Sequence, residues 1–202
     1  MGYNMEEKTL NNKLKLLLHS CCGPCSSTVI LRLKENYDVT VLYYNPNIYP
    51  EEEYLHRKQV QLDLIDKINQ EYGESVKVLD VEYDPENYEK FVCGLENEKE
   101  GGARCTKCFE LRLSKTALLA KENGFDVFAT TLTVSPHKNA PLINSIGERI
   151  SKEVGVDYLV SDFKKQDGYK TSIELSKKYN LYRQNYCGCK YSMWFLKGAD
   201  RQ

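Results

Sequence analysis

Long hydrophobic runs are absent from this sequence of 202 residues. Every apolar run is far shorter than the roughly 20 residues that a helix needs to cross a bilayer, so we expect no membrane association. The N-terminal stretch MGYNMEEKTLNNKLK also lacks the apolar centre and the small-residue cleavage site of an export signal. These two absences predict a cytoplasmic protein.

Glycine-rich phosphate loops are missing as well. Neither GxGxxG nor GxxxxGK[ST] occurs, which argues against a dinucleotide or Walker-type nucleotide site. The net charge of −1 excludes a polycation, but residues 164–202 hold nine Lys or Arg against three acids, which gives +6 there and −7 elsewhere. A basic end of this kind could bind phosphates, although a solvated helical surface explains the charge alone better.

Cysteine, by contrast, is plentiful, with eight residues. In a reducing cytoplasm, clustered thiols indicate metal binding or catalysis more often than disulfides. Three groups stand out in the sequence: Cys21, Cys22 and Cys25; Cys105 and Cys108; Cys187 and Cys189. The remaining Cys93 falls in a predicted amphipathic helix, where we expect it to pack in the core.

The three cysteine groups allow three kinds of chemistry. The two pairs offer four thiolates, which suits a tetrahedral zinc site or an iron–sulfur cluster. The first group could hold a second metal with an open coordination position, or Cys22 and Cys25 of CGPC could act as a redox dithiol. The alternatives are therefore a metalloenzyme, a thiol-disulfide oxidoreductase using Cys22 and Cys25, and a zinc-stabilised RNA-binding module.

Strand and helix patterns alternate along the chain. Apolar and β-branched runs predict strands at 13–20, 38–47, 75–83, 125–133 and 156–163. Helical spacing predicts helices at 26–36, 50–73, 85–95, 106–124, 139–155, 169–180 and 189–198. The first helix has Ser26 or Ser27 as its expected N-cap. We expect a single α/β domain over residues 1–202, with a parallel five-stranded sheet, helices on both faces, C-terminal helices and a disordered stretch at 1–12.

Polar and thiol side chains gather where these strands end. Open parallel sheets bind ligands beyond the carboxyl ends of their strands, and HSCCGPCSS, YYNPN and TTLTVSPHKN all follow such ends. We therefore expect the metal site at this edge. Candidate proton donors are His19 and His137, and candidate substrate-binding residues are Asn45, Asn47, Ser135, Lys138 and Arg183. Turn chemistry, capping or surface exposure explains several of these residues equally well.

The ordered motifs LLLHSCCGPCSS, YYNPNIYPEEEYLHRKQ, GGARCTKCFELRL, ATTLTVSPHKN and DFKKQDGYKTSIELSKKYNLYRQNYCGCKYS together resemble the cobalamin-independent epoxyqueuosine reductases. The resemblance runs from residue 14 to 196 and implies a HUP-like fold (adenine nucleotide alpha hydrolase-like). It implies reduction of the cyclopentane epoxide of epoxyqueuosine in tRNA to queuosine, the last step of queuosine biosynthesis. The implied partners are the tRNA anticodon loop and an electron donor that the sequence does not identify.

The same resemblance implies the cofactors. They are a [4Fe-4S] cluster and an adjacent second iron ion. By motif, the implied ligands are Cys21, Cys22, Cys105, Cys108, Cys187 and Cys189.

Overall fold

The computed structural model describes residues 13–193. In chain order the elements are β1 (Leu14–His19), α1 (Gly23–Leu33), β2 (Tyr37–Leu42), α2 (Glu51–Tyr72), β3 (Lys77–Leu79), α3 (Pro85–Phe91), α4 (Ala103–Glu122), β4 (Val127–Thr130), the 3₁₀ helix η1 (Thr131–Val134), α5 (Ala140–Val154), β5 (Asp157–Tyr158) and α6 (Gly168–Lys178). Residues 190–193 are helical. The rest of the helix expected at 189–198, and the disorder expected at 1–12, lie outside the described residues.

The five strands form one parallel sheet in the order β3-β2-β1-β4-β5. This order places β1 at the centre, between β2 and β4, and the direction of winding changes there. His19, the last residue of β1, pairs with Leu42 on one side and Thr130 on the other. The three central strands therefore end level with one another, and the expected parallel five-stranded α/β sheet is confirmed.

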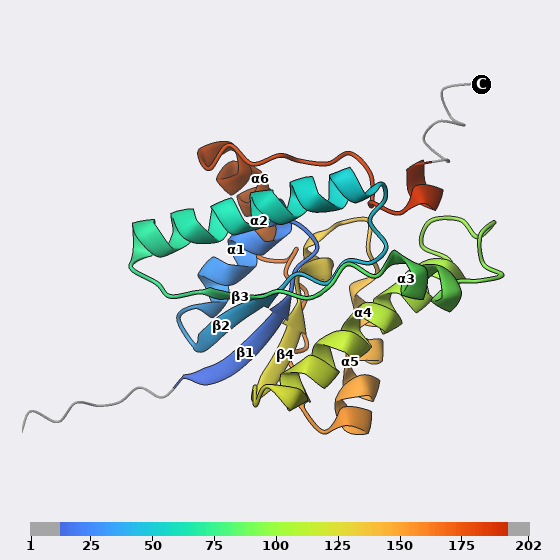
Figure 1. The fold of residues 1–202 in the computed structure, drawn as a ribbon. Coiled ribbons are helices and arrows are strands. Elements are labelled where there is room, and N and C mark those ends of the chain that lie inside the picture. Colours follow the sequence, from blue (N-terminus) through green and yellow to red (C-terminus); the bar gives the residue numbers. More distant parts are fainter. Residues whose placement is uncertain (1–12, 194–202) are drawn as a thin grey trace, which may run out of the picture.

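Helices cover both faces of the sheet, as expected. Figure 1 shows α1, α2 and α6 on one side and α4 and α5 on the other. Alternate residues of β1 serve the two layers, because successive side chains of a strand point to opposite faces. Leu16 and Leu18 belong to the core that contains Ile30 of α1, whereas Leu17 belongs to the core that contains Leu113 of α4.

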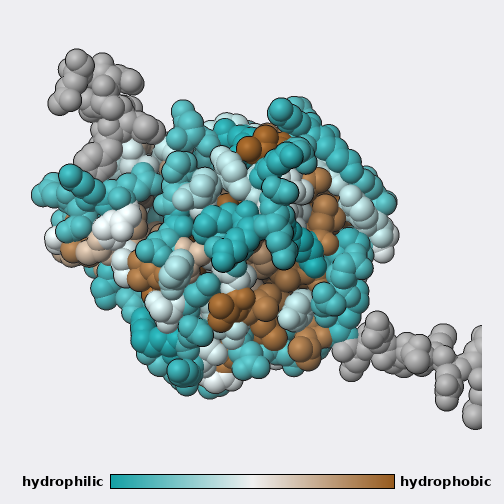
Figure 2. Space-filling model, turned by 180° about the vertical axis from the view of Figure 1, so that it is seen from behind, coloured by the Kyte–Doolittle hydropathy of each residue, from teal (hydrophilic) through white to brown (hydrophobic). Residues whose placement is uncertain are grey.

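One face of the molecule shows how polar and apolar residues are distributed on its surface. Seen from behind, hydrophilic residues surround smaller groups of apolar ones (Figure 2). No helix within residues 13–193 is long and apolar enough to span a membrane.

Several strands are shorter than the patterns predict. β3 has three residues and β5 has two. The strand expected at 125–133 stops at Thr130, whose side-chain oxygen accepts a hydrogen bond from Leu132 N at 3.2 Å. This local bond favours a turn over a continued strand, and η1 follows directly.

Two helix boundaries also differ from expectation, and both concern cysteines. The first helix begins at Gly23 with Cys22 as its N-cap, so the expectation of Ser26 or Ser27 as N-cap was wrong. Pro at the second position of α1 suits the first turn of a helix, where its missing N–H is no loss. α3 ends at Phe91, which leaves Cys93 beyond the helix and exposed, so the expected packing role for Cys93 was also wrong.

The start of α6 permits only glycine. A Cβ atom on Gly168 would lie 1.7 Å from the backbone oxygen of Phe163, which cannot move aside as a flexible side chain could. We expect Gly168→Ala to lower the free energy of unfolding by about 1–3 kcal/mol, as overpacking does. Denaturant unfolding would measure the change, with the exposed Lys170→Ala in the same helix as control. Equal stability of the two variants would contradict this account.

Candidate metal centre

Three thiols meet where β1 passes into α1. The sulfur atoms of Cys21, Cys22 and Cys25 all lie within 4.8 Å of one another, and those of Cys21 and Cys22 are 3.8 Å apart. The turn brings them together because Cys22 is the N-cap and Cys25 lies in the first helical turn. All three are free thiols. We call these three residues the thiol triad.

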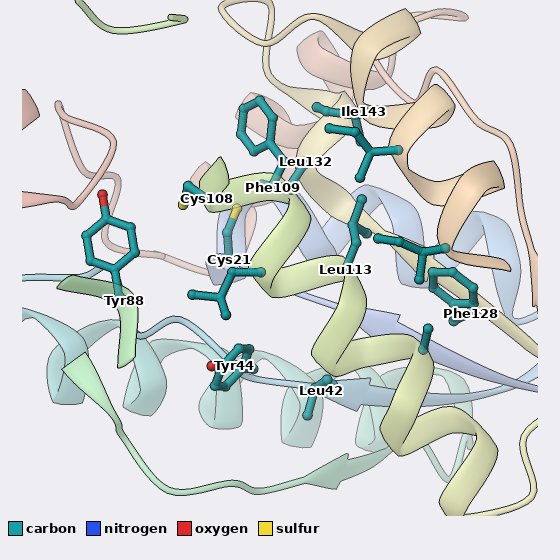
Figure 3. Close-up of a cluster of buried hydrophobic side chains, with 14 of the residues drawn as sticks. Cys21, Leu42, Tyr44, Tyr88, Cys108, Phe109, Leu113, Phe128, Leu132 and Ile143 are labelled. Carbon is teal, nitrogen blue, oxygen red and sulfur yellow. The ribbon is translucent and has the colours of Figure 1, made fainter. Parts of the chain in front are cut away.

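The other two cysteine pairs lie at the same edge of the molecule. Cys108 of α4 and Cys189 belong to the same buried cluster as Cys21 and Cys22. Figure 3 shows Cys21 and Cys108 near each other within that cluster, between Tyr88 and Phe109. Burial raises the pKa of Cys108 to about 12, and Cys187 and Cys189 lie close enough to add to this rise.

A glycine between the last two cysteines shapes their approach. Gly188 has a φ of 114°, which side-chain-bearing residues rarely adopt, and a Cβ atom there would lie 3.0 Å from Arg57 Nη1. Arg57 Nη1 also donates to the carbonyl oxygen of Cys187 at 3.4 Å. The Cys-Gly-Cys turn is therefore fixed closely against α2.

The three thiols of the triad shift one another's pKa values through hydrogen bonds. The pKa of Cys21 is lowered chiefly by its side-chain hydrogen bonds with Cys22 and Cys25, with further help from Lys138 and Arg112. The hydrogen bond to Cys21 raises the pKa of Cys22 to about 11, and the pKa of Cys25 is raised by bonds to both other thiols. Cys21 is therefore the member of the triad whose thiol loses its proton most readily.

Two cations face these sulfurs from within the protein. Burial opposes the charge of Arg112, but Cys108 and Cys21 outweigh it, so the pKa of Arg112 is raised. Lys138 behaves in the same way: burial opposes its charge, while Cys21 and Cys187 raise its pKa. The pKa of each cation is raised by Cys21 of the triad and by Cys187, and that of Arg112 also by Cys108. The three cysteine groups therefore lie close enough to interact electrostatically.

A cleft of about 670 Å³ opens beside the thiols. Its lining includes Cys21, Cys25, Arg57, Glu100, Ser135, His137, Lys138, Tyr169, Arg183, Gln184, Tyr186 and Cys187. Four of the seven non-cysteine candidates from the sequence are among them: Ser135, His137, Lys138 and Arg183. Thiols from two distant parts of the chain therefore reach one solvent-accessible space.

The other three candidates, His19, Asn45 and Asn47, are buried and do not line the cleft. His19 Nδ1 lies 2.9 Å from Thr130 Oγ1, and Arg112 Nε donates to His19 Nε2 at 3.2 Å. Burial, followed by the charge of Arg112, lowers the pKa of His19 to about 3. Asn45 accepts a bond from Arg112 Nη2 at 2.6 Å and donates to Ser20 O at 2.9 Å. His19 and Asn45 thus hold Arg112 in place.

Sequence reasoning missed two buried arginines. Arg112 follows Cys108 by four residues, which places both on one side of α4, and this spacing is the signal that could have revealed it. Arg57 is 2% exposed, pairs with Glu53 at 2.7 Å and lies 5.0 Å from the ring centre of Tyr186. Its Nη2 atom is buried without a partner among the described residues. Only the folded contacts identify Arg57.

Arg112 supports a testable prediction. Arg112→Gln would leave His19 Nε2 without its donor and the sulfurs with Lys138 but not Arg112 nearby, so we expect the free energy of unfolding to fall by about 1–3 kcal/mol. The loss should be larger for metal-loaded protein, whose thiolates carry more charge. Denaturant unfolding of both forms, beside Lys115→Gln on the same helix, would measure it. An equal loss in both forms would contradict the electrostatic role.

Comparison with known proteins supplies a family. The family model described as "Epoxyqueuosine reductase QueH" matches residues 16–194. A protein of that name from Staphylococcus epidermidis is 46% identical over 180 residues, covering 88% of this chain and 76% of the relative. Its namesake from Streptococcus pyogenes serotype M1 is 46% identical over 185 residues, covering 92% and 72%. The one from Thermotoga maritima is 36% identical and covers 88% and 90%.

Solved structures are more distant. The U34-tRNA thiolase NcsA from Methanococcus maripaludis with its [4Fe-4S] cluster matches with a TM-score of 0.49 and 18% identity, over 90% of this chain and 62% of that one. So remote a likeness decides nothing about ligands or activity. The family match spans nearly the whole described chain, and the relatives match over most of their own length. The chain belongs to the epoxyqueuosine reductase QueH family.

Proposed function

We propose that this protein reduces the cyclopentane epoxide of epoxyqueuosine in tRNA to queuosine, with a [4Fe-4S] cluster and a second iron ion as cofactors. The names of its relatives supply the reaction. The observation that carries the proposal is the thiol triad, three sulfurs within 4.8 Å beside a cleft that Cys187 also lines. A cytoplasmic location, where tRNA and reduced thiols occur together, fits this function.

The donor set fits these cofactors. Thiolates are the usual ligands of [4Fe-4S] clusters, and we assign the cluster to Cys105, Cys108, Cys187 and Cys189. The thiol triad would hold the second iron. Buried anions require nearby compensation, which the charges of Arg112 and Lys138 provide. When bound, the cluster supplies single electrons and an iron with an open position supplies Lewis acidity.

The reaction consumes two electrons and two protons and releases the epoxide oxygen as water, leaving an alkene. The chain must therefore deliver protons and stabilise charge on that oxygen. His137 lines the cleft and is exposed, so we propose it as the proton donor. Lys138, in the same lining, would stabilise the developing negative charge. His19 is buried and neutral, and its proposed contribution is to position Arg112.

Substrate contacts would come from the rest of the lining. We propose that Ser135 and Arg183 bind the modified nucleoside, since both face the cleft. The base must leave its stack to reach the thiols, as it does in other enzymes that modify bases. Asn45 and Asn47 lie inside the protein, so we assign them to shaping the site rather than to substrate contact.

A dithiol mechanism has less support. A thiol-disulfide oxidoreductase needs an accessible thiol with a lowered pKa. Here the pKa values of Cys22 and Cys25 are raised, and the lowered one belongs to Cys21, which hydrogen-bonds to both. A zinc-stabilised RNA-binding module would require zinc in place of iron and would not carry electrons.

The decisive experiment combines metal and nucleoside analysis. Protein reconstituted anaerobically with iron and sulfide, reduced by dithionite, should convert epoxyqueuosine in tRNA to queuosine, seen as the loss of one oxygen by mass analysis. Cys105→Ser and Cys189→Ser should lose the cluster absorbance and at least about 10–100-fold of the activity. The exposed Cys93→Ser is the matched control and should keep both. A colourless, zinc-binding protein without conversion would refute the function.

The basic surface of α6 supports a second prediction. Lys170 and Lys177 are exposed on α6, whose Tyr169 and Ser172 line the cleft. We expect the double charge reversal Lys170→Glu and Lys177→Glu to weaken tRNA binding and to lower the slope of log affinity against log salt by about 0.7–0.9 per lost phosphate contact. Binding at several salt concentrations would test this, with the exposed Lys152→Glu on α5 as control. Unchanged affinity would remove α6 from the tRNA interface.

A further inference from the structure

Within residues 13–193, the cleft beside the thiols is lined by one carboxylate and four basic side chains. The basic side chains are Arg57, His137, Lys138 and Arg183. Among the described lining residues, Glu100 is the only acid. We propose that Glu100 pairs with the cationic secondary amine of the modified nucleoside and thereby determines specificity for it. This inference rests on the proposed function, because that function names the nucleoside.

Glu100 is free to bind such a group. It lies in the segment between α3 and α4, and its Oε2 accepts one long hydrogen bond, from Ser192 Oγ at 3.3 Å. Among the described residues it makes no ion pair. The neighbouring acids are engaged with the backbone: Glu96 accepts from Gly94 N at 3.0 Å and Glu98 from Ala103 N at 3.3 Å.

Its position is beside the thiols. The next residue, Gly101, also lines the cleft and donates its N–H to Cys105 Sγ at 3.2 Å. The pKa of Cys105 is raised, chiefly by burial, and the charge of Glu100 adds to that rise. A ligand group that contacts Glu100 therefore lies at a wall of the cleft that adjoins Cys105.

Glu100 is exposed, so water solvates its carboxylate when the cleft is empty. Its negative charge beside the thiols repels anionic ligand groups and attracts a cationic one. Epoxyqueuosine supplies such a cation. Its secondary amine joins the deazaguanine ring to the cyclopentane ring that carries the epoxide, and alkylamines are protonated near neutral pH, as Lys is. Because the amine is attached to the reacting ring, its partner must lie near the reaction centre, as Glu100 does.

The pairing would also distinguish modified from unmodified tRNA. Guanine at the wobble position has no such amine, so it would leave Glu100 unpaired in the complex. Queuosine retains the amine after reduction, which allows recognition to be measured without turnover.

The test compares two tRNAs that differ only at the wobble base, queuosine or guanine, bound to iron-loaded full-length protein. The wild type should prefer the queuosine tRNA. Glu100→Gln, which removes the charge and keeps the shape, should reduce this preference about tenfold, because the queuosine amine loses its partner and the guanine complex no longer leaves a carboxylate unpaired. Glu96→Gln in the same segment is the control and should keep the full preference. Iron content and cluster absorbance of each variant are measured alongside.

Three results would overturn the inference: no preference in the wild type, an undiminished preference in Glu100→Gln, or loss of iron in that variant, which would make Glu100 a metal ligand. Reductase activity is assayed separately on epoxyqueuosine tRNA. A wild type that prefers queuosine tRNA but reduces nothing would refute the proposed reaction while leaving the pairing by Glu100 intact.

Discussion

The concentration of sulfur at one edge of the sheet is the constraint on which the rest of the site depends. Clustered thiolates repel one another, and burial increases that repulsion unless cations lie close by. Arg112, on α4, and Lys138, just before α5, meet this requirement. Arg112 is in turn fixed by His19 at the end of β1 and by Asn45 after β2. The polar interior of this edge is therefore organised around charge balance.

The segment that carries the last cysteines is held by α2 and its preceding turn. Tyr49 N donates to Gly188 O at 2.8 Å, and Tyr186 donates to Tyr49 O at 3.0 Å. Arg57 adds its contact with Cys187 O and with the ring of Tyr186. These contacts, rather than a strand or helix, position Cys187 and Cys189, so α2 shapes the site although none of the cysteines lies on it.

The sequence predicts the parallel sheet and the meeting of the cysteine groups well, because both follow from local periodicity and from the common direction of strand ends. It predicts side-chain roles less well. His19 has the chemistry of a proton donor, but its burial is a property of the packed sheet. Cys93 has a helical pattern around it, yet α3 ends two residues earlier. The free carboxylate of Glu100 is recognisable only once the cleft around it is known.

The order of these segments along the chain has a consequence for biosynthesis. A ribosome releases the thiol triad early and the Cys187–Cys189 turn long afterwards, so a nascent chain carries reactive sulfurs without their final neighbours. Under the proposed function, the complete set of cysteines can bind iron only after that turn has been translated. Premature oxidation in this interval is a hazard specific to a centre assembled from such widely separated parts of one polypeptide.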